Sequence, residues 1–426
     1  MTTTTGFRID LEPLRTPAYR RFVIAWSLSL ASLWVFYTAQ TWTFLESSGT
    51  AAAVAYLPIA LVIPVPIALI VGGLLTDSRG PKTILVLAQA ATALTIGFIG
   101  VLDLAHQLTF VPTLATGLLM GVFGGLGSVP AQALMVRMVD RRLIASAYAL
   151  SLVTVGLGRL VGGPIGGVIV QAVGSAPAFA VSAGGVLLAT LLFVTLPDVE
   201  PLDAAGARIS RRDLADAIGW VRYMPAAIAV IAFDAILAGL VYPYTAVVPV
   251  IARDLLGGGA ADLGVLIAAG GVGVLVGGTI ITPLARRLGQ GRLLVAGVLA
   301  AAAGIAGLAV SGSVLTSSAL AAVAGGASNV ASVTSGLLLQ TMSPPRLRGR
   351  VLALDGVVAN IVNPASLLGG GLLVERSGAQ VVLLAMSGLI ALAVGSIVVA
   401  HRPVVGLDVD GQGRAIGVPP PRRRSA

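Results

Sequence analysis

The stretch Gly72-Gly73-Leu74-Leu75-Thr76-Asp77-Ser78-Arg79-Gly80-Pro81-Lys82 decides the fold, because it is a short charged turn between two long apolar runs. Residues 51–75 carry no charge up to this turn, and residues 83–102 carry none after it. Each run reaches the roughly 20 apolar residues that a helix needs to cross a bilayer. The turn therefore predicts two antiparallel membrane helices that meet at one face of the membrane.

The composition of the whole chain agrees with an integral membrane protein. Of its 426 residues, 56% are hydrophobic and 11% are charged, whereas a soluble domain carries about 25% charged residues. The apolar runs are continuous and lack the alternation of barrel strands. We therefore expect an all-α membrane protein whose backbone hydrogen bonds are satisfied within its helices.

Twelve apolar stretches are long enough to span the membrane, six on each side of a polar linker. They lie at residues 22–41, 51–75, 83–102, 108–136, 143–171, 176–196, 224–251, 262–284, 293–311, 314–340, 351–374 and 379–400. The predicted segments are a cytoplasmic amino-terminal segment (1–21), an N-terminal six-helix bundle (22–196), a linker (197–223), a C-terminal six-helix bundle (224–400) and a disordered basic tail (401–426). In the linker, Leu214, Ile218 and Val221 recur at helical spacing, which predicts an amphipathic helix on the membrane surface.

The basic residues predict the orientation of these spans. Of the 27 Lys and Arg residues, 24 lie in segments on the side of the amino terminus, and the opposite side has only Arg253 and Arg376. The positive-inside rule therefore places both termini in the cytoplasm. The halves also repeat weakly, since Ala149-Leu150 corresponds to Ala353-Leu354 and Gly72-Gly73 to Gly277-Gly278. This spacing predicts a parallel six-plus-six duplication.

Several function classes are disfavoured by residues that the chain lacks. It has no cysteine, and its two histidines, His106 and His401, lie far apart in the sequence. We therefore expect no thiolate chemistry, no metal site and no cofactor, and the sequence has no phosphate-binding loop for ATP. The net charge is +9, and the basic residues that give it lie beside membrane spans. This position favours a lipid surface over nucleic acid as the partner. We do not expect an enzyme.

The charged turn has the residues of a switch. Asp77 lies within five residues of Arg79 and Lys82, so the acid can pair with these bases or with a neighbouring helix end in one conformation and separate in another. Gly73 and Gly80 are expected to allow close helix approach and a tight turn. The alternative is an ordinary basic turn that only sets topology. The corresponding turn of the second half, residues 285–292, has no acid.

The fifth span contains the run Gly162-Gly163-Pro164-Ile165-Gly166-Gly167. Proline removes one backbone hydrogen bond, and glycines allow a helix to bend and to pack closely. We expect Gly163, Pro164, Gly166 and Gly167 to act as a functional motif of this helix. The alternative is a generic small-residue packing face.

Two charges lie deep within spans. Arg159 is in the fifth span and Asp234 in the seventh, and each would cost about 2.5–3.5 kcal/mol if it faced lipid. The functional hypothesis makes Asp234 a carboxylate that alternates between a proton and either the substrate or Arg159. The alternative is a fixed structural ion pair. Asp355 lies near the start of its span and is expected to reach cytoplasmic water.

Uncharged polar groups also recur at depth and predict a central cavity. They are Asn329, Asn360 and Asn363. A kink is expected at Pro364, and the motif Tyr242-Pro243-Tyr244 predicts a break near the end of the seventh span. Each of these asparagines could instead form ordinary hydrogen bonds between helices.

The order Gly-x-x-x-Asp-x-x-Gly-x-Lys resembles the signature loop of the major facilitator superfamily. The glycine–proline run resembles the fifth-helix motif of its exporters. With residues 14–22, 249–257 and 347–354, the chain resembles the branch of the enterobactin exporters and other transmembrane secretion effectors. The resemblance implies a twelve-helix monomer in the bacterial plasma membrane that couples protons to the export of a drug, siderophore or secondary metabolite by alternating access.

Two features depart from the family pattern. Drug–proton antiporters of this superfamily usually carry an arginine in the fourth helix, whereas residues 120–125 have none, and Ser78 and Pro81 stand where bases are common. Coupling would then rely on Asp234 or Arg159. Uptake of a solute, lipid flipping, or a membrane sensor that transports nothing are the alternative functions.

Overall fold

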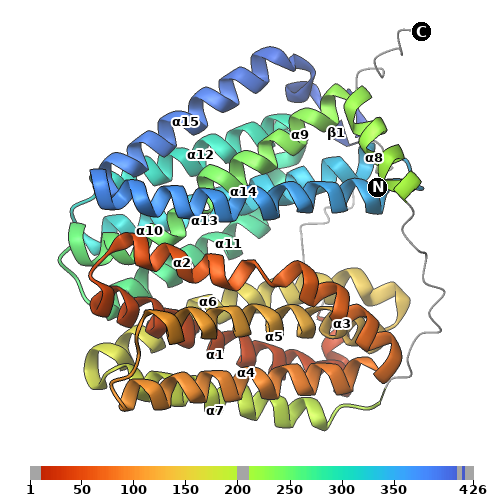
Figure 1. Cartoon of the computed structure of the whole chain (residues 1–426). Coiled ribbons are helices and arrows are strands. Elements are labelled where there is room, and N and C mark those ends of the chain that lie inside the picture. The colour runs from red at the N-terminus through yellow and green to blue at the C-terminus, as the bar shows by residue number, and fades with distance from the viewer. Residues whose placement is uncertain (1–10, 199–210, 410–414, 418–426) are drawn as a thin grey trace. The chain divides into compact units, whose positions relative to one another are not determined.

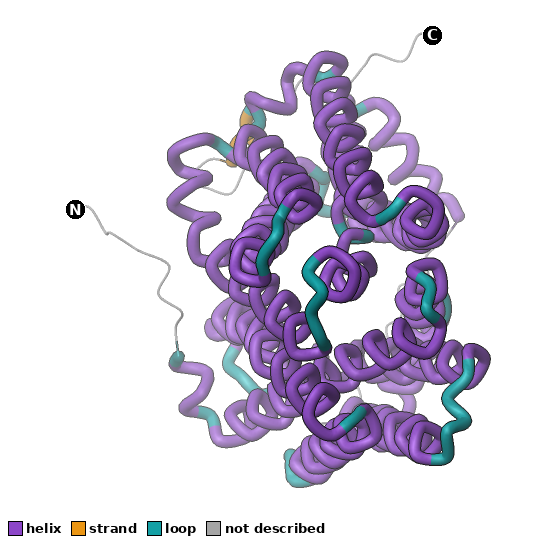
Figure 2. Tube along the Cα trace, turned by 90° about the vertical axis from the view of Figure 1, so that its left-hand side faces the viewer, coloured by secondary structure: helices purple, strands orange, loops and turns teal. Residues whose placement is uncertain are grey.

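The computed structural model describes residues 11–198, 211–409 and 415–417. Within these residues, twelve helices are long and apolar enough to cross a membrane (Figure 1). The strands in the same described residues are the two-residue β1 (Asp408–Val409) and β2 (Ala415–Ile416), which pair antiparallel (Figure 2). The predicted fold class, an all-α membrane protein with twelve spans, is confirmed.

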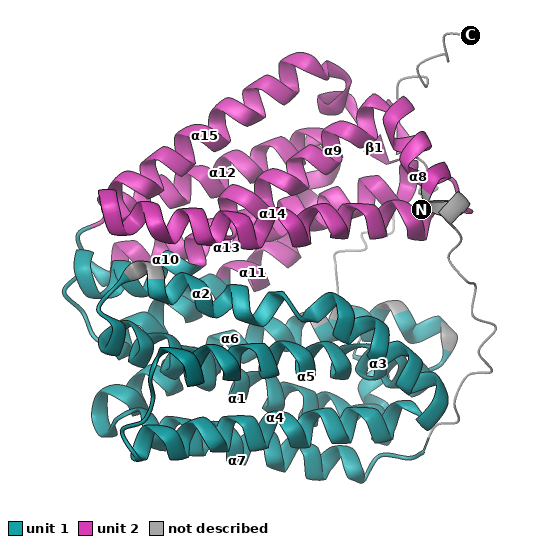
Figure 3. Ribbon diagram, in the orientation of Figure 1, with its two compact units in different colours: residues 1–205, 246–272, 312–314 teal, residues 206–245, 273–311, 315–426 magenta. Residues whose placement is uncertain are grey.

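The chain forms two compact units, shown in different colours in Figure 3. Unit 1 contains Met1–Ala205, Ala246–Val272 and Gly312–Val314. Unit 2 contains Gly206–Thr245, Gly273–Ser311 and Leu315–Ala426. The units therefore differ from the two expected bundles, because unit 1 includes a segment of the seventh and eighth spans.

Unit 1 is built from the first six spans and this added segment. Its helices are η1 (Glu12–Arg15), α1 (Pro17–Ser48), α2 (Ala51–Val62), α3 (Val65–Arg79), α4 (Pro81–Leu104), α5 (Phe110–Arg137), η2 (Arg141–Leu143), α6 (Ile144–Val173), α7 (Ser175–Val194) and η4 (Ile251–Leu255). Helix α1 packs against α6 and α7, and α4 packs against α5 and α7. At one end of α1, the buried Tyr19 donates its hydroxyl to the Ala147 carbonyl at 2.9 Å, which fixes α1 against α6.

The second span differs from the single straight helix that its apolar run predicts. It is interrupted at Ile63–Pro64 and continues as α3. Pro64 and Pro66 explain the interruption, because proline lacks the N–H of the helical ladder and clashes with the preceding turn.

Unit 2 contains most of the second half. Its helices are α8 (Arg211–Tyr223), α9 (Pro225–Ile236), η3 (Leu237–Val241), α12 (Gln290–Val310), α13 (Val314–Met342), α14 (Arg348–Ser377), α15 (Ala379–Ala400) and η5 (Arg402–Gly406). Two further helices, α10 (Tyr244–Val250) and α11 (Ala260–Leu288), are divided between the units, and the first residue of α13, Val314, belongs to unit 1. Helix α8 covers the expected amphipathic stretch of the linker and packs on α14.

The seventh span is irregular, as Pro243 and Pro249 predict. Residues 225–255 run through α9, the π-helical η3, α10 and the π-helical η4. Wide turns of this kind leave backbone carbonyls without their usual partners, and they often occur at functional sites.

The start of the tail is folded, which corrects the expectation of disorder for its described residues. Val404 and Leu407 are buried, and the Leu407 carbonyl accepts a hydrogen bond from the Gly291 N–H at 2.8 Å. The two apolar side chains and this backbone bond attach the segment to α12. Residues 410–414 and 418–426 lie outside the described residues.

Candidate functional site

The charged turn is reduced to a single glycine between two helices. Helix α3 ends at Arg79, α4 begins at Pro81, and Gly80 joins them with φ 83° and ψ 148°. This backbone region is essentially restricted to glycine. Gly289 has nearly the same conformation, φ 80° and ψ 156°, between α11 and α12. The tight turn expected at Gly80 is therefore present.

The charges of this turn do not pair with one another. Lys82 instead forms an ion pair with Asp198, with 3.1 Å between Nζ and Oδ1. In the part of the chain that the structure describes, the exposed side chains of Asp77 and Arg79 make no hydrogen bond or ion pair. Among the described residues, this conformation therefore lacks the pairing of Asp77 with Arg79, Lys82 or a neighbouring helix end that the sequence predicts.

Gly72, rather than Gly73, allows the close helix approach expected at this turn. A Cβ atom on Gly72 would lie 2.9 Å from the Leu126 carbonyl oxygen of α5, whereas a Cβ on Gly73 would meet nothing within 4 Å. The expectation for Gly73 was wrong by one helical position, because two adjacent glycines point in directions about 100° apart.

The glycines of α6 form two packing faces. Gly158, Gly162 and Gly166 face α1, where a Cβ on Gly162 would lie 2.1 Å from the Ala31 carbonyl oxygen. Gly163 and Gly167 face the first turns of α11. Within unit 1, the fifth-helix motif therefore lets α6 lie close to α1 and to the first turns of α11.

The contact between α6 and α11 is made by backbone atoms. A Cβ on Gly264 would lie 2.6 Å from the Gly163 carbonyl oxygen and 2.9 Å from Cα of Pro164. A Cβ on Gly167 would lie 2.3 Å from the Ala260 carbonyl oxygen. The Gln171 side-chain oxygen also accepts a hydrogen bond from the Ala261 N–H at 2.9 Å. Helix α6 therefore holds the start of α11 tightly.

Arg159 lies on the same face of α6, about one turn before Gly163. Its Nε donates to the Ile267 carbonyl at 3.1 Å. Its guanidinium carbon lies over the Trp34 ring, 5.0 Å from the ring centroid. The arginine therefore contacts both α1 and α11, and the structure describes these contacts within unit 1.

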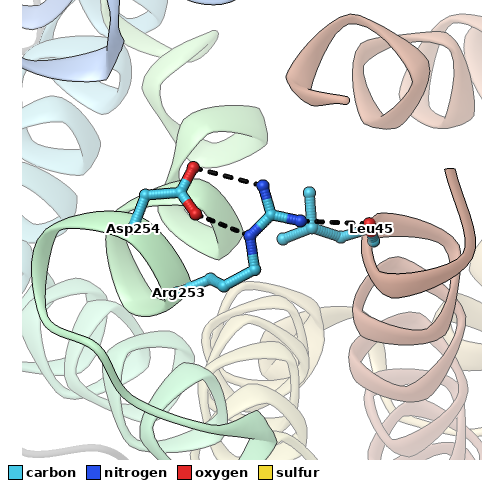
Figure 4. A network of polar contacts seen from close by, with 3 residues as sticks. All are labelled: Leu45, Arg253 and Asp254. Carbon is cyan, nitrogen blue, oxygen red and sulfur yellow. Dashed lines mark hydrogen bonds and ion pairs between the residues drawn. The ribbon is translucent and has the colours of Figure 1, made fainter. Parts of the chain in front are cut away.

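A second arginine links the end of α1 to η4 (Figure 4). Arg253 forms two hydrogen bonds to the Asp254 carboxylate, at 2.6 and 3.2 Å, and Nη1 donates to the Leu45 carbonyl at 3.2 Å. The same carbonyl accepts from the Gly49 N–H at the end of α1. Cations favour a helix carboxyl end, where carbonyls lack partners, so Arg253 stabilises this junction.

Asp234 lies in unit 2, in contact with α13 and α14. Its Oδ2 accepts a hydrogen bond from the Ser335 hydroxyl of α13. The Asp355 carboxyl of α14 lies within hydrogen-bonding reach of the Asp234 carboxyl. Oδ1 of Asp355 is buried and has no partner among the described residues. The two carboxyl groups, with Ser335, are called the carboxyl pair below.

The three asparagines have different surroundings. Asn363 donates to the Ala238 carbonyl in η3 at 2.9 Å, so it satisfies one carbonyl of the irregular seventh span. Asn360 is exposed and donates to the Gly356 carbonyl of its own helix at 2.8 Å. Asn329 is half-buried and has no side-chain partner within the described ranges.

Sequence reasoning missed the contact of Asp355 with Asp234. A signal was present, since the seventh and eleventh spans run in the same direction and begin at Pro225 and Arg348. With a rise of 1.5 Å per residue, Asp234 lies about 14 Å and Asp355 about 11 Å from these starts. The two acids therefore lie at similar depths, which rules out treating Asp355 as a purely surface group.

Comparisons with known proteins agree with this architecture. The enterobactin exporters EntS of Escherichia coli O1:K1 / APEC and of Salmonella paratyphi A are each 28% identical over 312 residues, which is 71% of this chain and 73% of theirs. A mutant of the nucleoside transporter NupG matches with a TM-score of 0.75 at 13% identity, over 90% of this chain and 99% of its own.

A bacterial homolog of the human lysosomal transporter Spinster, in an inward-facing and unoccupied conformation, matches with a TM-score of 0.70. The identity is 13%, over 92% of this chain and 98% of the other. These two structures have the same fold as this chain. The family model described as transmembrane secretion effector matches residues 9–416. The chain therefore belongs to the transmembrane secretion effector family of major facilitator transporters.

Proposed function

We propose that the chain is a proton-coupled exporter of a small amphipathic molecule, acting by alternating access in the bacterial plasma membrane. Membership of the secretion effector family and similarity to enterobactin exporters support export. The excess of Lys and Arg residues on one side of the spans supports cytoplasmic termini. The chain would act as a monomer, because one copy contains all twelve described spans.

The carboxyl pair is the observation that supports proton coupling. Two ionised carboxylates within hydrogen-bonding reach repel each other strongly in a medium of low dielectric constant. A single proton shared by Asp234 and Asp355 removes this repulsion. The buried Oδ1 of Asp355, which has no hydrogen-bond partner among the described residues, leaves an ionised pair poorly solvated.

Arg159 is unsuited to carry the proton. A guanidinium group stays protonated under all conditions that proteins tolerate, so Arg159 provides a fixed charge. The proposed division of roles therefore assigns the proton to the carboxyl pair and leaves Arg159 to contact the cargo. Asp77, whose side chain is exposed and unpaired among the described residues, would form its contact in another state of the cycle.

Enterobactin is the first cargo to test, because it is the molecule named for the relatives. Purified protein would be reconstituted in liposomes that contain a pH-sensitive dye, and enterobactin would be added at one face. We expect enterobactin to move protons in the opposite direction for the wild type. Asp234→Asn and Asp355→Asn should abolish this signal, because neither variant keeps two titratable carboxyls in contact.

Asp103→Asn is the matched control. Asp103 accepts a hydrogen bond from the Ser175 hydroxyl at 2.5 Å and lies outside the carboxyl pair, so its replacement should leave proton movement intact. Movement of cargo without protons would contradict the coupling. Movement only toward the cytoplasm would indicate uptake, and movement of labelled lipid between leaflets would indicate flipping. No movement of cargo, lipid or proton would indicate a sensor.

A further inference from the structure

Arg159 has more hydrogen-bond donors than the protein uses. It is the fourteenth of 28 residues in the span Ser146–Val173, and its guanidinium has five N–H donors. Its Nε is bonded to the Ile267 carbonyl. Among the described residues, Nη1 and Nη2 have no acceptor, and no carboxylate lies within 4.0 Å. The middle of the membrane thus has a cation without a counter-charge from these residues.

The guanidinium is held in one place by three neighbours. The Trp34 ring covers one face, and the Ile267 carbonyl fixes Nε. Gly270 of α11 makes room on a third side, since a Cβ there would lie 2.9 Å from Nη2 and 3.1 Å from Cζ. A cation fixed this way needs little reorganisation when an anion binds. Arg159 is also half-buried rather than enclosed, which leaves part of it accessible.

A purely structural role explains only part of this arrangement. One hydrogen bond to the Ile267 carbonyl requires one donor, which a glutamine could supply without a charge. An arginine at this depth is costly unless a partner or water satisfies it. Its planar fork matches the two oxygens of a carboxylate or similar oxyanion. An indole ring beside it suits an aromatic or apolar body.

We propose that Arg159 and Trp34 form an anion-recognition site for the cargo. The cargo class is an organic anion in which a carboxylate or another oxyanion is joined to an aromatic or apolar body. This proposal rests on the proposed export function and assigns the cargo's negative charge to unit 1. An anionic lipid headgroup has the same chemistry, so the experiment distinguishes a soluble anion from a lipid.

Trp34 provides the readout. Replacing Trp26, Trp42 and Trp220 by Phe leaves Trp34 as the only tryptophan of the full-length chain. This protein would be placed in nanodiscs of phosphatidylcholine and titrated with 4-nitrobenzoate or with the neutral isostere 4-nitrobenzamide, both of which quench tryptophan. We expect saturable quenching by the anion with an affinity at least about tenfold above that of the amide.

Two arginine variants test the assignment. Arg159→Gln should remove the preference for the anion, whereas Arg253→Gln, which changes an arginine bonded to Asp254 elsewhere in unit 1, should keep it. Each variant must show the elution volume and thermal transition of the parent before it is titrated. Equal affinities for the two probes in the parent, absence of saturation by the anion at millimolar concentration, or a preference that survives Arg159→Gln would overturn the proposal.

A lipid arm identifies the source of the anion. If the site takes soluble anions, 4-nitrobenzoate should quench Trp34 with the same affinity in nanodiscs that contain phosphatidylglycerol as in nanodiscs of phosphatidylcholine. Competition by phosphatidylglycerol that disappears in Arg159→Gln would support the same site with a lipid headgroup as its ligand. The titration requires no transport, so its failure leaves the proton measurement with Asp234→Asn unaffected, and the reverse also holds.

Discussion

Gly167→Ala is expected to weaken the contact between α6 and the start of α11. The added Cβ would lie 2.3 Å from the Ala260 carbonyl oxygen and 3.0 Å from Cα of Ala261. Ordinary contacts of this kind begin at 3.4 Å, so the two backbones must separate by about 1 Å. Overpacking of this size costs about 1–3 kcal/mol. This cost corresponds to a shift of about 5- to 150-fold in the equilibrium between the packed and the separated arrangement of α6 and the start of α11.

Cysteine cross-linking measures this shift directly, because the chain has no cysteine of its own. Cysteines would replace Gln171 and Ala261, whose native groups are joined at 2.9 Å. A short bifunctional thiol reagent would join the two cysteines, and we expect Gly167→Ala to reduce the yield of this cross-link. Gly184→Ala, at a position in α7 where a Cβ meets nothing within 4 Å, should leave the yield unchanged. An unchanged yield in the folded Gly167→Ala protein would refute the close backbone packing.

Two further predictions concern backbone geometry and a buried carbonyl. Gly80→Ala should destabilise the protein by about 1–3 kcal/mol because of its glycine-only conformation and lower the unfolding temperature in detergent. Gly73→Ala, a helical position with open space around it, should be neutral or slightly stabilising; equal effects would contradict the assignment. Asn363→Leu should cost about 1–3 kcal/mol, because it leaves the Ala238 carbonyl unpaired. The exposed Asn360→Leu should stay within about 0.5 kcal/mol, and thermal unfolding of the two variants side by side tests the difference.

The twelve spans could be predicted because the bilayer imposes a simple pattern on the sequence. A membrane helix needs about 20 apolar residues, and charges concentrate at its ends. The irregular seventh span could be predicted for the same kind of reason, since Pro243 and Pro249 each lack the N–H that a regular helix needs. The interruption of the second span at Pro64 was not predicted, because the exact position of a break in a proline-containing helix depends on how the helix packs.

The partners of the site residues depended on contacts distant in sequence. The depths of Asp234 and Asp355 in their spans could be read from the sequence, but the contact of the two acids, which are 121 residues apart, could not. Whether Gly72 or Gly73 faces α5 depends on the rotation of α3 about its axis, which the local sequence does not determine. The folded start of the tail depends on burial of Val404 and Leu407, and its proline-rich basic composition obscured these two apolar residues.

Arg159 and Arg253 illustrate what could and what could not be predicted from the sequence. Arg159 could be singled out from the sequence because a charge at mid-span is costly. Its contacts with Trp34 and Ile267 could come only from the structure. Arg253 was used for topology and as part of the resemblance over residues 249–257, whereas the structure bonds it to Asp254 and the end of α1.

Infrared spectroscopy of the carboxyl pair tests the central proposal most directly, because it needs no knowledge of the cargo. A protonated carboxyl group has a C=O stretching band well separated from that of a carboxylate. The account predicts such a band at neutral pH in the wild-type protein, absent from both Asp234→Asn and Asp355→Asn and retained in Asp103→Asn. A wild-type spectrum without the band, or a band that persists in both variants of the pair, would contradict a proton shared by Asp234 and Asp355.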